Sequence, residues 1–176
     1  MKTANVLRES WMETIMAWAD RNGVDEIFVP RSAEALLDAE SLNLFCPGLR
    51  DYPEGFGNLT RLTSLDMSAN LLPAVPGWIS RLTQLKHLSL RHNDLQILPE
   101  WIGELGKLRT LDAGRNKLSD LPESLCRLQN LEWLAVNRNP LRNGQPVIER
   151  LCARGCTVFM CGSGSVIRNI RERKEC

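Results

Sequence analysis

The sequence lacks the long apolar segments that would place it in or across a membrane. No uninterrupted run approaches the roughly 18 residues that a spanning helix needs, and residues 1–23 lack the apolar core of a cleaved signal peptide. Charge of one sign is also missing, since 22 basic and 21 acidic residues give a formal net charge of +1. We therefore expect a protein that is cytoplasmic, or exported without a cleaved signal peptide, with no membrane association.

Metal and redox motifs are equally scarce. The six cysteines include Cys152, Cys156 and Cys161, whose spacing lacks the paired C-x2-C units of structural zinc sites. The two histidines, His87 and His92, lie far from these cysteines in the sequence. We expect reduced thiols, with no zinc and no disulfide framework.

Sequence signatures of catalysis are missing as well. There is no glycine-rich phosphate loop, no nucleophile elbow and no paired-histidine metal motif. A catalytic cysteine would need a nearby base, and neither histidine is expected beside Cys152 or Cys156. The chain is therefore predicted not to be an enzyme and to need no cofactor.

What the sequence does have is leucine, 28 residues in all, most of them at regular spacing. Alignment of the leucines that would open a strand reveals a 23-residue period. The first half of the unit reads Leu62-x-x-Leu65-x-Met67-x-x-Asn70-x-Leu72. The same pattern starts again at Leu85, Leu108 and Leu131, with another apolar residue in place of Met67. The second half reads Leu98-Pro99-x-x-Ile102-x-x-Leu105, with close matches from Val75 and Leu121.

Simple geometry explains this pattern. Leucines two residues apart, such as Leu88 and Leu90, point the same way from a short strand and can fill a core. An asparagine at the point where the chain leaves the strand can satisfy backbone groups that would otherwise be buried without a partner. Prolines that follow, such as Pro99, fix φ where the chain returns on the opposite side and no ladder donor is needed.

The pattern resembles the leucine-rich-repeat family over about residues 36–153. An earlier, degenerate unit starts at Leu42 and has Pro47 in place of the asparagine, which suits a terminal repeat. The resemblance implies an α/β solenoid, a curved right-handed superhelix with short parallel strands on its concave side. The asparagine ladder of such a solenoid would consist of Asn70, Asn93, Asn116 and Asn139.

Residues 1–38 are predicted to form a helical N-terminal cap. One apolar stripe at helical spacing comprises Leu7, Trp11, Ile15 and Trp18. Gly23 would end this helix, residues 27–30 would form an extended connector, and Ser32 would cap a second short helix. The cap resembles that of small bacterial leucine-rich-repeat proteins with a tryptophan-containing helix. Trp11 and Trp18 fit the cap core, and the alternative is a helix that binds a partner.

Residues 39–153 would hold about five repeats, and residues 154–176 a C-terminal cap and tail. Alternation over residues 157–161 predicts a last parallel strand after a short helical stripe at Val147, Ile148 and Leu151. Residues 162–165 would be a flexible break. The basic stretch from Val166 is interpreted either as a solvated helical tail or as an arm that contacts an acidic partner.

The family resemblance implies that the concave sheet binds protein partners through the residues between the core leucines. The predicted contacts are Asp66, His87, Arg91, His92, Asp112, Arg115, Trp133, Asn137 and Arg138. Trp133 would be an interface anchor or would pack against Phe159. The basic residues would either pair with the aspartates or select a complementary partner. On the convex side, Trp78 and Trp101 are expected to stack, and a second interface there stays open.

These observations predict a protein-interaction module. It would be a monomeric bacterial scaffold or translocated effector without membrane association. Its partner would be a protein whose identity the sequence does not give. The alternative is binding of nucleic acid or another polyanion through the concave arginines and the basic tail. Salt dependence separates the two, because phosphate-dominated binding weakens steeply as salt rises.

Overall fold

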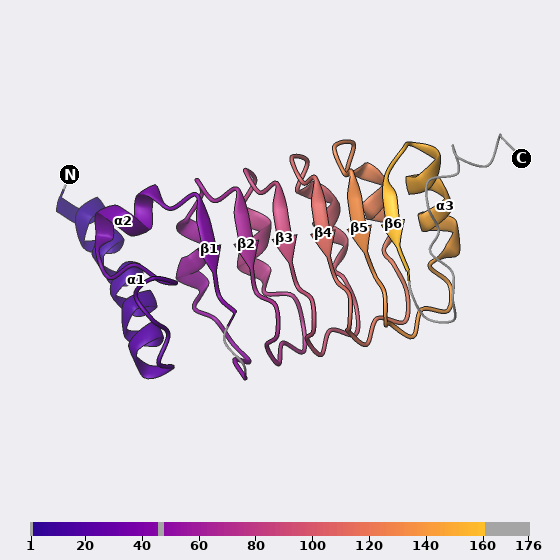
Figure 1. Cartoon of the computed structure of the whole chain (residues 1–176). Coiled ribbons are helices and arrows are strands. Elements are labelled where there is room, and N and C mark those ends of the chain that lie inside the picture. The colour runs from indigo at the N-terminus through magenta and orange to yellow at the C-terminus, as the bar shows by residue number, and fades with distance from the viewer. Residues whose placement is uncertain (1, 46–47, 161–176) are drawn as a thin grey trace, which may run out of the picture.

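The computed structural model describes residues 2–45 and 48–160, with side chains described from Ser10 onward (Figure 1). The helices are α1 (Lys2–Arg21), α2 (Ala33–Asp38) and α3 (Gln145–Ala153), with four 3-10 helices η1 (Glu54–Asn58), η2 (Gly77–Arg81), η3 (Glu100–Glu104) and η4 (Glu123–Arg127). The strands are β1 (Ser41–Asn43), β2 (Ser64–Asp66), β3 (His87–Ser89), β4 (Thr110–Asp112), β5 (Trp133–Ala135) and β6 (Thr157–Phe159).

The strands form one parallel sheet in chain order, β1 to β6. Equivalent residues of successive units face each other across it, so that Leu65 pairs with Leu88 and Leu88 with Leu111. The same row continues through Leu134 to Val158. The solenoid predicted from the 23-residue period is therefore confirmed, with each unit adding one strand in a constant register.

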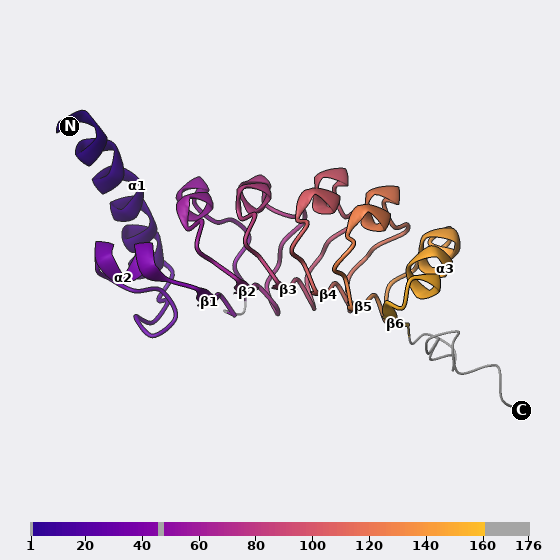
Figure 2. The ribbon, with the colours of Figure 1, turned by 90° about the horizontal axis from the view of Figure 1, so that it is seen from above.

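A single apolar core lies between the sheet and the 3-10 helices. Leu65, Leu88 and Leu111 are at most 2% exposed on the sheet side, and Ile79 and Ile102 are fully buried on the helical side. The strands lie closer together than the helices opposite them (Figure 2). The sheet is therefore the inner, concave wall of the curved molecule.

The four ladder asparagines tie neighbouring units together, as Asn93 shows. Its Nδ2 donates to the carbonyl oxygens of Met67 in the preceding unit (3.0 Å) and Leu90 in its own (3.1 Å). Its Oδ1 accepts from the backbone N–H of Leu72 (3.1 Å). Equivalent bonds are made by Asn70, Asn116 and Asn139. Each side chain thus satisfies backbone groups that the core would otherwise leave unpaired.

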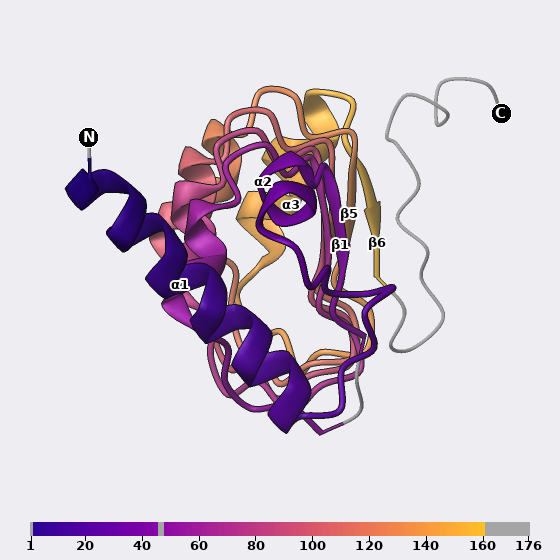
Figure 3. The same ribbon diagram turned by 90° about the vertical axis from the view of Figure 1, so that its left-hand side faces the viewer.

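The N-terminal end of the core is covered by α1 and α2 (Figure 3). Trp18 is 6% exposed and meets the ring of Phe56 edge-on at 5.4 Å between centroids. Trp11 is partly buried against the same core, so the interpretation of both tryptophans as cap core is confirmed. Gly23 follows α1 with φ +64°, and the Ser32 hydroxyl caps α2 by accepting from the backbone N–H of Ala35 (3.2 Å).

Two local predictions were wrong. The segment expected as an extended connector is a turn, in which the Asp25 carbonyl accepts from Phe28 and Val29 and its Oδ1 from Ile27 (3.0 Å). An aspartate that bonds the backbone two residues on favours a turn over an extended chain. Within the described residues Trp78 does not stack on Trp101; it is buried and packs against Phe56 with centroids 5.5 Å apart.

The C-terminal end is closed by α3 and β6. Val147, Ile148 and Leu151 of α3 are buried, as is Val158 of β6, which confirms the predicted helix and last strand. Cys161, the predicted break at residues 162–165 and the basic tail lie outside the described residues.

Candidate partner-binding surface

The concave wall is the face of the sheet that no described helix covers. Every described helix lies on the other side of the strands or at the two ends (Figures 2 and 3). The residues between the core leucines of each strand therefore point away from the core. Four strands show the pattern clearly, because β1, β2, β3 and β4 each bury their central leucine between two residues that stay at least partly exposed.

A row of left-handed residues marks the strand exits. Ala69, His92, Arg115 and Arg138 occupy the same position in successive units and have φ values of 54°, 56°, 53° and 56°. Left-handed backbone is uncommon for residues other than glycine, asparagine and aspartate. Backbone hydrogen bonds between successive units hold this conformation here. The backbone N–H of His92 donates to the Gly114 carbonyl (2.9 Å), and that of Arg115 donates to the Asn137 carbonyl (2.7 Å). The directions of these side chains are therefore set by the scaffold.

The two aspartates of the predicted surface have a structural task that the sequence reasoning missed. Asp66 Oδ1 accepts from the backbone N–H of Ser68, and Asp112 Oδ1 from that of Gly114, both at 2.8 Å. Each bond closes the turn that leaves the strand. The available signal was an aspartate two residues before a serine or glycine at a strand end, which is typical of an Asx turn.

The predicted basic line divides into paired and unpaired members. Arg91 Nη1 lies 3.6 Å from Asp112 Oδ2, a cross-strand ion pair of the kind the sequence suggested. The side chains of His92, Arg115 and Arg138 have no hydrogen-bond or ion-pair partner among the described residues. The concave face therefore carries uncompensated positive charge at the exits of β4 and β5.

Arg115 is partly buried, and its Nε–H is enclosed without an acceptor in the described part of the chain. Arg138, one unit along, is exposed. The guanidinium group keeps its charge at any physiological pH. Arg115 has thus lost part of its hydration while keeping its full charge, an unusual state for a side chain on an open face.

Trp133 opens β5 and is half-buried. It lies in register with Thr110 on one side and Thr157 on the other. The ring contacts of the described residues do not include Trp133, so its expected packing against Phe159 is not found. Phe159 pairs with Ala135 instead and is itself only partly buried. Trp133 therefore presents part of an unpaired indole to the concave face.

Asn137 differs from the prediction that placed it on the exposed surface. It is 5% exposed, because its side chain lies over Gly114 of the preceding unit. A Cβ added to Gly114 would come within 2.5 Å of Asn137 Oδ1, and this oxygen has no hydrogen-bond partner among the described residues. Sequence periodicity places a residue on a face of the sheet. It does not reveal that a glycine in the neighbouring unit leaves space in which the side chain becomes buried.

His87 completes the predicted set. It is exposed at the start of β3, and its Nδ1 lies 2.9 Å from the Thr110 hydroxyl on the next strand. This contact orients the imidazole across the sheet. The charged and aromatic members of the surface therefore share one face, with the unpaired ones gathered toward the C-terminal half.

The described cysteines are free thiols in or near the C-terminal cap. Burial raises the pKa of Cys156 to about 11 and also raises that of Cys152. Thiols held in the protonated state are poor nucleophiles and poor metal ligands. Within residues 2–45 and 48–160, no group of three or more histidine, cysteine, aspartate or glutamate side chains is placed to hold a metal ion.

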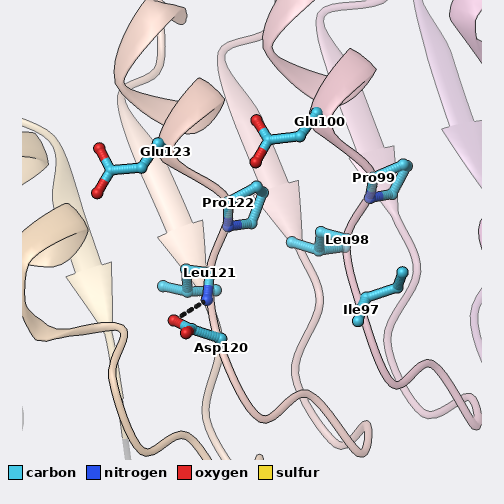
Figure 4. Close-up of a pocket in the computed structure, with 8 residues that line it drawn as sticks. All are labelled: Ile97, Leu98, Pro99, Glu100, Asp120, Leu121, Pro122 and Glu123. Atoms are coloured by element: carbon cyan, nitrogen blue, oxygen red, sulfur yellow. Dashed lines mark hydrogen bonds between the residues drawn. The ribbon is translucent and has the colours of Figure 1, made fainter.

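A shallow groove of about 360 Å³ lies between the segments that lead into η3 and η4 (Figure 4). Its walls are Ile97, Leu98, Pro99, Glu100, Asp120, Leu121, Pro122 and Glu123. Its carboxylates are engaged within the protein, since Asp120 accepts from Leu121 N–H (2.7 Å), Glu100 from Ser124 N–H (3.3 Å) and Glu123 pairs with Arg150. The groove offers a ligand few free polar groups. The groove is therefore a less suitable candidate binding site than the concave face.

No helix among the described residues is both long enough and apolar enough to cross a lipid bilayer.

Two models of protein families match the repeats of this chain. A model described as a leucine-rich-repeat region matches residues 77–151, and one described as a leucine-rich repeat matches residues 48–95. Together they span most of the repeats that the structure shows. No curated protein sequence matches the chain.

Two solved bacterial structures share the fold. A leucine-rich-repeat protein of Leptospira interrogans is 29% identical with a TM-score of 0.56, over 70% of this chain and 37% of the other. An internalin of Listeria monocytogenes is 22% identical with a TM-score of 0.60, over 73% of this chain and 42% of its own. The chain thus spans well under half the length of either protein. At these identities the likeness concerns the architecture.

Proposed function

Because the chain belongs to the leucine-rich-repeat family, whose members are generally binding modules rather than enzymes, we propose that it binds a partner protein on the concave face of its solenoid. The observation that carries this proposal is a group of side chains without partners on a sheet face that no described helix covers. The side chains of His92, Arg115 and Arg138 have no hydrogen-bond or ion-pair partner among the described residues, and Trp133, at the start of β5 on the same face, is partly exposed.

The physical argument concerns cost and gain. The strand exits are held rigid by the ladder, so little conformational entropy is lost when a partner binds there. Tryptophan and arginine are the residues that contribute most at protein interfaces. The paired Arg91 and Asp112 lie beside them, so a partner must match both signs of charge, which supports selection of one partner.

The proposal has further parts. It includes the absence of intrinsic catalysis, a monomeric state, and a role as a bacterial scaffold or a translocated effector. It also includes a location in the cytoplasm, or export without a cleaved signal peptide. Light scattering after gel filtration tests the monomeric state. Detection of an epitope-tagged chain in bacterial and host-cell fractions tests the location.

Surface variants test the binding face. Arg115→Glu and Trp133→Ala should each reduce capture of partner proteins about tenfold or more, since a lost hot-spot contact is worth about 2 kcal/mol. Arg127→Glu is the matched control, because Arg127 is exposed on η4 at the convex side. Thermal unfolding of each variant verifies that folding is kept. Equal capture by all four proteins would refute the proposal.

A further inference from the structure

We propose that the exits of β4 and β5 form an anion site that takes carboxylates of an acidic protein segment, with Arg115 and Arg138 as its cationic groups. This inference rests on the proposed function and adds the chemistry of the partner. It identifies the partner segment by aspartate or glutamate side chains that reach these two arginines.

The charge balance of the face carries the first step. Asp112 is the acidic residue of the neighbouring strand, and both of its oxygens are engaged, Oδ1 by the Gly114 N–H (2.8 Å) and Oδ2 by Arg91 (3.6 Å). Glu132, just before β5, lies 3.5 Å from Arg109 instead. The described residues thus leave Arg115 and Arg138 without a counterion, whereas Arg91 and Arg109 each have one.

The second step concerns hydration. Removing a charged group from water is a main cost of forming an interfacial ion pair. Arg115 has already met part of this cost, because its Nε–H is buried with no acceptor among the described residues. A carboxylate that reaches its outer N–H groups therefore gains more than it would at a fully hydrated arginine. The planar guanidinium also matches a carboxylate in a two-bond geometry.

The third step concerns spacing. Arg115 and Arg138 occupy equivalent positions on adjacent units, with φ values of 53° and 56°. Neighbouring strands lie about 4.8 Å apart, so two carboxylates at a similar separation can be met at once. Trp133, which is half-buried at the start of β5, offers an apolar contact for a residue of the segment farther along the same face.

A protein carboxylate is favoured over the phosphates of a nucleic acid. Nucleic-acid binders neutralise many phosphates with a broad basic surface, whereas the proposed site has two arginines, Arg115 and Arg138, without a counterion among the described residues. The formal net charge of +1 gives no long-range attraction either.

A random peptide library displayed on phage, selected against the immobilised full chain, supplies the probes. The selected peptides should be rich in aspartate and glutamate. Arg115→Gln and Arg138→Gln should each weaken binding of a soluble selected peptide about tenfold, as should replacement of its acidic residues by the matching amides. The combined protein and peptide changes should weaken binding less than the product of the two. Arg127→Gln, an exposed arginine of η4 with no ion pair among the described residues, is the control and should bind as the wild type.

The outcomes separate this inference from the proposed function. Neutral peptides that need Trp133 but not Arg115 would overturn the anion site and leave concave binding standing. Peptides insensitive to all concave variants, or no enrichment at all, would count against both. Tighter binding of a thymidine oligonucleotide than of the acidic peptide, with a steep salt dependence, would overturn the assignment to a protein carboxylate.

Discussion

At the scale of single residues, equivalent positions in the repeat carry equivalent physical tasks. Each ladder asparagine, like Asn93, donates to carbonyls of the preceding unit and of its own unit and accepts from one backbone N–H. This task is recognisable in the sequence because an amide is one of few side chains that donates and accepts at once. The consequence is that the asparagines should matter for stability far more than their polarity suggests.

Replacement of Asn116 by alanine tests this directly. The change leaves the Leu95 N–H without its partner, and the Leu90 and Ala113 carbonyls each lose one of their two amide donors, keeping those of Asn93 and Asn139. Unfolding in urea should show a loss of about 1–3 kcal/mol, the usual cost of unsatisfied buried groups. Asn130→Ala is the control, because Asn130 is exposed and makes one bond to Gly106 (2.7 Å). Equal losses in both variants would show that the ladder is not special.

Cys156 links a single residue to the pH dependence of folding. Its pKa in the folded protein is about 11, against an ordinary value of 9.0. Below pH 9 folded and unfolded chains both keep the thiol proton; as the pH rises toward 11 only the unfolded chain loses it, so stability falls. Unfolding in urea at several pH values should show a steeper fall for the wild type than for Cys156→Ala. Parallel curves for the two proteins would contradict the burial of this thiol.

The sequence predicted which concave residues share a face, and it predicted less well what each does there. Alternation along a strand is a property of the backbone, so the positions of His87, Arg115 and Trp133 followed from the period alone. The sinking of Asn137 over Gly114 and the turn-closing bond of Asp112 depend on neighbours in space. The left-handed backbone at Ala69, His92, Arg115 and Arg138 has no signal in these residue types.

At the scale of elements, the convex 3-10 helices pack closely enough that side-chain volume decides their spacing. Gly103 of η3 faces η4, and a Cβ there would lie 2.3 Å from the backbone oxygen of Ser124. Gly106, three residues on, has open space around it. The two glycines of one repeat therefore make a matched pair.

Gly103→Ala should destabilise the protein, and Gly106→Ala should not. The first change forces η3 and η4 apart, with an expected cost of about 1–3 kcal/mol for overpacking. The second adds a methyl group in open space and reduces the freedom of the unfolded chain, so stability should stay equal or rise slightly. Thermal unfolding of the two variants measures the difference. A drop of similar size at Gly106 would show that loss of glycine itself, and not the contact, is responsible.

The helical caps and the last strand followed from periodicity, whereas the connector between α1 and α2 did not. The stripe that contains Ile15 and Trp18 is long enough to identify a helix. Residues 27–30 are too few for a period, and the Asp25 side chain decided their conformation. The expected stacking of Trp78 on Trp101 was also based on the period alone, since the two are one period apart. Instead, Trp78 packs against the ring of Phe56 in the degenerate first unit.

At the scale of the whole molecule, the stacked units contain two kinds of position. Core positions hold the solenoid together, and concave positions face away from the core. The core leucine of the strand repeats from β1 to β5 and the ladder asparagine in the four full units, so they carry the fold. The concave residues differ from unit to unit, from Ser64 through His87 to Trp133 in one row. A surface that varies on a constant scaffold is suited to recognising one partner.

Site-specific photo-crosslinking in living cells tests the central claim most directly. A photoreactive residue replaces His87 on the concave face in one protein and Glu104 on the convex side in another, both of which are exposed. We expect a crosslinked partner protein from position 87 and none from position 104. Crosslinking from position 104 with none from position 87 would contradict the assignment of the concave face as the binding surface.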